Sequence, residues 1–279
     1  MGRAACAWPI GASGKTSEMI SLSPMDLALA GVLVALDAGV SIALRLQLHR
    51  QLLWAGARMV IQLIVVGYIL RFIFALSSPA ATLVIILIMM AIAAREVAAR
   101  PARSFKGLMG YGVSAAAVTL ATLLTAGLAL TTAIRPHPWY DPRYAISLTG
   151  IILGSVLNAG SLTLDGIVGG VWRERTAIEA QLGLGVPFRV AVRPLLREAI
   201  RKGLLPIINQ MSAAGLITLP GIMTGQILAG MDPVEAVKYQ ILLMFLLAGA
   251  SGVAALAIAD LTLRGLTDAR QRLRLDRLR

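Results

Sequence analysis

The sequence contains too few polar residues for a soluble protein of its length. Only 14% of its 279 residues are charged and 5% are aromatic, whereas 57% are hydrophobic and the mean hydropathy is +0.78. A soluble domain of this size could not hide so much apolar surface. The composition therefore predicts that the lipid bilayer is the solvent of this protein.

Cysteine and histidine are almost absent. The chain has one cysteine, Cys6, and two histidines, His49 and His137. A single cysteine excludes a disulfide within the chain and a thiolate metal cluster. No apolar span contains either residue type, so an intramembrane enzyme would lack a nucleophile with its base or a metal centre. We expect no catalytic residue and no cofactor bound by this chain, and metal ligands stay unassigned.

The amino-terminal segment contains a sequence that is similar to a phosphate-binding loop, at residues 11–16. That motif needs a glycine where Pro9 stands, and no strand is predicted before it. We therefore predict that residues 1–25 form a mobile tail without a nucleotide site.

Seven apolar segments are long enough to approach or exceed the roughly 20 residues that cross a bilayer as a helix. They are residues 26–44, 52–76, 79–94, 108–134, 144–164, 205–229 and 236–259. The sequence predicts an all-α, polytopic membrane protein with about seven transmembrane helices in a membrane domain over residues 26–262.

The net charge of +12 does not indicate a nucleic-acid partner, because the arginines lie between apolar spans and are not interleaved with stacking aromatics. Nineteen lysines and arginines fall in alternate loops and the carboxy-terminal segment, against two in the remaining loops. Positive loops stay cytoplasmic. The pattern predicts an external amino terminus and a basic cytoplasmic tail over residues 263–279.

The longest predicted cytoplasmic loop covers residues 165–204 and is too long to lack structure of its own. Residues 179–185 are predicted to form a short amphipathic helix that ends in glycines before Pro187. Arginines then recur at every fourth position from 189 to 201, and Pro194 should interrupt this stripe. Such a stripe is typical of a helix that meets anionic lipid, and a docking surface is the alternative.

Several segments together resemble one known family. In the loop, Glu179-Ala180 is followed by Gly185 and, farther downstream than in the usual importer pattern, by Leu205-Pro206. This arrangement is similar to the coupling loop by which permease subunits contact their ATPases. With the segments at 58–63, 67–68, 154–162 and 219–230, the chain resembles the FetB-type permeases of the UPF0014 family, iron exporters related to plant aluminium-tolerance proteins.

The resemblance covers residues 26–262 and implies a function. It implies a permease homodimer in the bacterial inner membrane, a cytoplasmic ABC ATPase that binds ATP-Mg, and export of iron or a related metal ion. It places the ATPase contact at Arg173, Glu174, Arg175, Glu179, Ala180, Gly183 and Gly185. The alternative is a secondary carrier or channel that is not coupled to ATP. Membrane acids beyond Asp37 are scarce, which weakens proton coupling but leaves this alternative open.

Polar side chains inside apolar spans are the candidates for a substrate pathway, because they are costly in hydrocarbon. The candidates are Asp37, Arg58, Gln62, Asn158, Asn209, Gln210, Met223, Thr224 and Gln226. We predict an ion pair between Asp37 and Arg58, and a kink at Pro220-Gly221. For Asn158, packing between helices is the simpler interpretation. The methionine thioethers suit cuprous ion better than iron, and the sequence offers no evident iron cage.

Overall fold

The computed structural model describes residues 23–76, 78–134, 141–268 and 270–278. Residues 1–22, with Cys6 and the segment similar to a phosphate-binding loop, lie outside the described residues, as does His137. The helices are α1 (Pro24–Ala43), α2 (His49–Leu76), α3 (Pro79–Ala99), α4 (Met109–Leu128), the π-helix η1 (Ala129–Ile134), α5 (Pro142–Arg173), α6 (Arg175–Gly183), α7 (Phe188–Ala191), α8 (Arg193–Ala213), α9 (Gly221–Leu228), α10 (Pro233–Leu266) and the 3-10 helix η2 (Leu275–Arg277).

The predicted all-α, multi-pass membrane architecture is confirmed. Six of the described helices, namely α1, α2, α3, α4, α5 and α10, are long and apolar enough to cross a bilayer. Many of their large apolar side chains are exposed to the surroundings, as lipid-facing surfaces require.

The predicted span over residues 205–229 is not one continuous helix. Helix α8 ends at Ala213 and α9 begins at Gly221, so the expected kink is a full break over residues 214–220. The amides of Ile217 and Thr218 both donate to the Ala213 carbonyl, at 3.0 and 3.1 Å. Gly215 has a φ of +84°, and Pro220 has no amide hydrogen, which together prevent the helix from continuing.

The chain divides into two compact units. The first unit comprises Met1–Val65 and Gly221–Val237, and the second comprises Val66–Pro220 and Lys238–Arg279. In the first unit, α1 turns back into α2, and the amide of Leu48 donates to Ser41 Oγ at 3.0 Å. Ala38 and Ser41 are buried on this side of α1.

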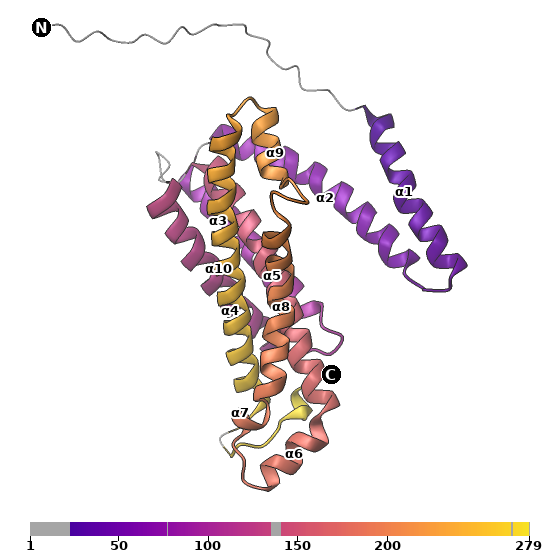
Figure 1. Ribbon diagram of the computed structural model, residues 1–279, viewed down its shortest axis with the longest axis vertical. Helices are drawn as coiled ribbons and strands as arrows, with labels where there is room; N and C mark the ends of the chain where they lie inside the picture. Colours follow the sequence, from indigo (N-terminus) through magenta and orange to yellow (C-terminus); the bar gives the residue numbers. More distant parts are fainter. Residues whose placement is uncertain (1–22, 77, 135–140, 269, 279) are drawn as a thin grey trace, which may run out of the picture. The chain divides into compact units, whose positions relative to one another are not determined.

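In the second unit, α5 is the central helix and contacts α3, α4 and α8 (Figure 1). Its contact with α8 depends on glycines. A β-carbon at Gly166 would lie 2.9 Å from Ala199 Cβ, and one at Gly203 would lie 2.8 Å from the Ala159 carbonyl oxygen. Small residues at these positions allow the two helices to approach closely.

Helix α5 extends beyond the end of α3. The amide of Ala102, just after α3, donates to Asp165 Oδ1 at 3.1 Å, and α5 continues from there to Arg173. Eight further residues lengthen the helix by about 12 Å at 1.5 Å per residue. The predicted loop over 165–204 therefore begins as an extension of α5, which carries α6 and α7 at its end.

The predicted short helix in this loop is confirmed. It is α6, which ends at Gly183, and Gly185 follows with a φ of +83°. The predicted arginine stripe is interrupted as expected, because α7 ends at Ala191 and α8 begins just before Pro194. Arg189 thus lies on a different helix from the rest of the stripe.

Candidate functional site

A polar cavity lies inside the second unit, where α5, α8 and α10 meet. Its volume is about 230 Å³. The lining residues are Ile151, Ser155, Asn158, Ala159, Gly203, Pro206, Ile207, Gln210, Leu247 and Ser251. The structure thus brings together two of the predicted pathway residues, Asn158 and Gln210.

The cavity presents neutral polar groups. Ser155 Oγ and Ser251 Oγ are 2.7 Å apart and share one hydrogen bond, which joins α5 to α10. Arg100 Nη1 donates to Asn158 Oδ1 at 3.4 Å. No carboxylate is among the lining residues, and the described chain holds no group of three or more His, Cys, Asp or Glu side chains arranged for a metal ion. Amide and hydroxyl groups are therefore what this cavity offers a solute.

The other predicted pathway residues do not line this cavity. Asn209 is exposed on α8, next to Gln210. Asp37, Arg58 and Gln62 belong to the first unit, on α1 and α2, and Met223, Thr224 and Gln226 belong to the same unit on α9.

The predicted ion pair between Asp37 and Arg58 is not formed. Asp37 is exposed and makes no ion pair with any of the described residues. Ala38 and Ser41, which are close to Asp37 on α1, are buried, whereas the Asp37 side chain itself is exposed. Opposite charge in the sequence was therefore not enough to place the two side chains against each other.

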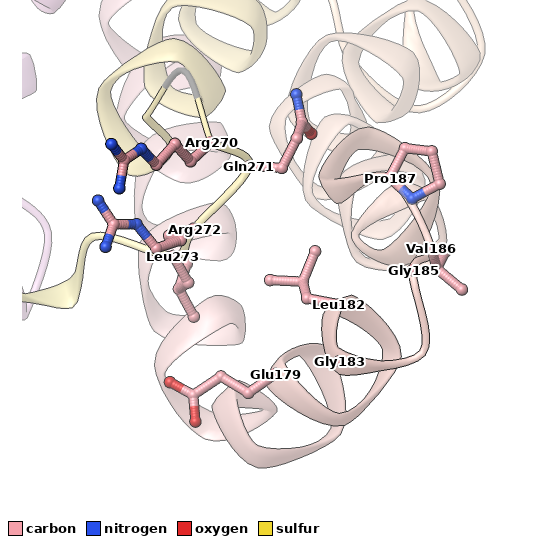
Figure 2. A pocket seen from close by; sticks show the side chains of 10 residues that line it. All are labelled: Glu179, Leu182, Gly183, Gly185, Val186, Pro187, Arg270, Gln271, Arg272 and Leu273. Atoms are coloured by element: carbon pink, nitrogen blue, oxygen red, sulfur yellow. The ribbon is translucent and has the colours of Figure 1, made fainter.

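A second candidate site lies at the end of α5, in the segment 174–192 that we call the α6 tip. Here α6 and the chain after α10 enclose a pocket of about 690 Å³ (Figure 2). Its lining residues are Glu179, Leu182, Gly183, Gly185, Val186, Pro187, Arg270, Gln271, Arg272 and Leu273. Three predicted coupling residues, Glu179, Gly183 and Gly185, therefore share this pocket.

The other coupling residues lie elsewhere at the tip. Arg173 and Glu174 line a small recess against α8, beside the ion pair between Glu198 and Lys202. Arg175 stacks over the ring of Trp172, with its Cζ 5.0 Å from the ring centroid, and Arg103 stacks at 3.9 Å. Ala180 is exposed on α6. The aromatic ring thereby ties the α3–α4 loop to the start of α6.

The carboxy-terminal segment is folded back on the second unit. Lys106 donates its amide to the Arg277 carbonyl at 2.7 Å, and Phe105 forms an isolated bridge with Leu278. Gln271 Oε1 accepts from the Phe188 amide at 3.1 Å. We call residues 267–278 the clasp, because they join the α3–α4 loop to the α6 tip.

Two aspartates organise the clasp. Asp268 Oδ1 accepts from the amides of Arg270 and Arg272, both at 2.9 Å, and these hydrogen bonds lower the pKa of Asp268. Asp276 receives two hydrogen bonds from the Arg274 guanidinium, each at 2.9 Å, which lower the pKa of Asp276 to about 2. Both carboxylates are thus favoured in their ionised form.

Sequence reasoning missed the clasp. It predicted only a basic tail, although Asp268 and Asp276 are placed among arginines at spacings that allow local pairing. It also left out Trp172, whose signal was an aromatic residue followed immediately by charged ones. Neither signal identifies the distant partner, which only the fold provides.

The model of the uncharacterised protein family UPF0014 matches residues 24–266. A UPF0014 membrane protein of Synechocystis is 43% identical over 81% of this chain and 88% of its own. The probable iron export permease protein FetB of Escherichia coli is 32% identical, over 89% and 93%. The protein ALUMINUM SENSITIVE 3 of Arabidopsis thaliana is 28% identical, over 82% of each. No solved structure gives a significant match.

Proposed function

Because the chain belongs to the UPF0014 family, we propose that it is the membrane-spanning permease subunit of an ABC transporter. In this proposal two copies form a homodimer in the bacterial inner membrane, and a separate cytoplasmic ATPase binds ATP-Mg. The amino terminus is external and the α6 tip is cytoplasmic, in agreement with the distribution of lysine and arginine.

The main observation in support of this proposal is that the α6 tip combines a short helix with exposed apolar side chains. A short helix stands at the end of an extended α5, outside the six candidate spans. After this helix the α6 tip exposes the apolar side chains of Leu184 and Val190, which are 85% and 56% exposed. Exposed apolar side chains on a projecting element are typical of a surface that another protein covers.

The proposed cargo is iron or a related metal ion. The support is the similarity to the Escherichia coli relative, which is named a probable iron export permease. The cavity with Asn158 and Gln210 is the proposed part of the pathway, because it is polar and lies between three helices. Its neutral oxygen donors favour a cargo that is held weakly and released, as transport requires.

The test is ATP hydrolysis by a candidate ABC ATPase of the same organism, reconstituted with this protein in liposomes. We expect hydrolysis to depend on the permease, to rise with one metal among ferrous, ferric and cuprous ions, and to collapse in Glu179→Lys. Glu179→Gln, which removes the charge without reversing it, should lie between the two. Hydrolysis that is indifferent to the permease, together with metal flux without ATP, would instead support a secondary carrier or channel.

A further inference from the structure

The clasp and the α6 tip form the two walls of one pocket. Leu182, Val186 and Pro187 come from the tip, and Leu273 comes from the clasp. Figure 2 shows Leu182 pointing from α6 into the space that faces the clasp. Leu182, Val186 and Leu273 are half-buried and Pro187 is exposed, and together they give the pocket an apolar interior.

The edge of the pocket formed by the clasp is basic. Arg272 is paired with Asp268 at 3.0 Å, which leaves Arg270 as an exposed guanidinium without an ion pair among the described residues. From residue 260 to 278 the chain carries five arginines and three aspartates. An apolar interior with a basic edge is complementary to an apolar side chain flanked by carboxylates.

The clasp holds this pocket open before any partner arrives. Its hydrogen bonds run to Phe188 in the tip and to the backbone of Lys106 and Leu266, so its position does not depend on a bound protein. A preformed surface loses less conformational freedom on binding than a flexible tail would. Leu184 and Val190, which are 85% and 56% exposed, extend the apolar surface beyond the pocket.

We propose that the clasp is the second half of the ATPase-docking surface, with α6 as the first half. The pocket between them receives an apolar side chain from an acidic segment of the ATPase, and Arg270 pairs with a carboxylate of that segment. This inference rests on the proposed function, and it adds a contact that lies outside the coupling loop.

Binding of the purified ATPase to the full-length permease tests this inference. The permease is placed in nanodiscs of zwitterionic lipid, so that anionic headgroups contribute nothing. We expect Arg270→Glu to weaken the affinity about tenfold, mainly through slower association, and to flatten its dependence on salt. Leu273→Ala should weaken it by a similar factor through faster dissociation. The matched control is Arg143→Glu at the opposite end of α5, which should bind like the wild type. Arg143 lies about 45 Å along the helix from Arg173, at 1.5 Å per residue.

The outcomes separate the inference from the proposed function. If Glu179→Lys abolishes binding while Arg270→Glu and Leu273→Ala bind normally, the ATPase docks on α6 alone and the inference is wrong. If the wild type does not bind the ATPase at all, both the proposed function and the inference are wrong. If Arg270→Glu weakens ATPase binding in nanodiscs of anionic lipid but not in zwitterionic ones, Arg270 acts through anionic headgroups and not through a direct contact with the ATPase, and the inference is wrong. Unchanged gel-filtration profiles and melting temperatures show that the variants are folded.

Discussion

Gln271 Oε1 accepts a hydrogen bond from the Phe188 amide at 3.1 Å and so caps the first turn of α7 with a side chain 83 residues away. The amide at the start of a helix has no partner within the helix, and Phe188 is fully buried. This single contact fixes the clasp to the α6 tip.

Gln271→Ala should release the clasp from α7. We expect a loss of about 1 kcal/mol, the usual net value of one hydrogen bond, and faster amide exchange across residues 267–278. Hydrogen–deuterium exchange of the protein in detergent measures this. Gln271→Glu, which keeps an oxygen acceptor, should retain most of the protection; equal exchange in both variants and the wild type would contradict the capping role.

Trp172 should stabilise the fold through its contacts with two arginines. Arg103 and Arg175 lie over its ring, so Trp172→Leu is expected to lower stability by about 1–2 kcal/mol, whereas Trp172→Phe keeps part of the interaction. The coupling is measured by thermal unfolding of Trp172→Leu, Arg103→Met and the double variant. Additive effects in this cycle would show that the ring and the guanidinium do not interact.

Alanine substitutions at Gly203, in the contact between α5 and α8, and at Gly169, outside it, should have opposite effects on stability. At Gly203 a β-carbon would overlap the Thr163 hydroxyl and the Ala159 carbonyl, so Gly203→Ala should destabilise the protein by about 1–3 kcal/mol. At Gly169 nothing lies within 4 Å, and alanine should be neutral or stabilising there. Melting temperatures in detergent compare the two, and similar values would argue against close packing at Gly203.

The clasp should detach in acid. The folded state lowers the pKa of Asp276 to about 2, from about 3.9 in an unfolded chain. Its contribution is therefore complete above pH 4 and is lost as the pH falls toward 2. Pepsin cleavage within residues 267–278, normalised to an unstructured peptide, should rise over this range. Asp276→Asn should be cleaved readily throughout, and a wild-type profile that stays flat would rule out this carboxylate as the trigger.

The cavity distinguishes two neighbouring residues that were both predicted to lie on the pathway. Gln210 lines the cavity and Asn209 does not. In the reconstituted transport assay, Gln210→Ala and Asn158→Ala should reduce metal flux about tenfold, and Asn209→Ala should have a clearly smaller effect. The opposite order would place the pathway outside this cavity.

The sequence alone determined the features that depend on local order. Hydropathy located six of the seven predicted spans, since length and apolar character decide whether a helix can cross a bilayer, but it did not reveal the break over residues 214–220. The glycines after α6 and Pro194 before α8 marked helix ends, because backbone freedom and a missing amide act within one turn. The coupling role of Glu179, Gly183 and Gly185 came from a resemblance to permease coupling loops and stays a prediction, although the three residues line one pocket.

Only the tertiary structure decided which distant residues meet. Asp37 and Arg58 have opposite charges, yet the structure leaves Asp37 exposed and without an ion pair among the described residues. Asn158 and Gln210 line one cavity because glycines let α5 approach α8. The sequence predicted the clasp only as a basic tail. Its contacts with Lys106 and Phe188 are a property of the fold. Such pairings depend on the rotation and register of packed helices, which are set by the fit of whole surfaces and not by any local pattern.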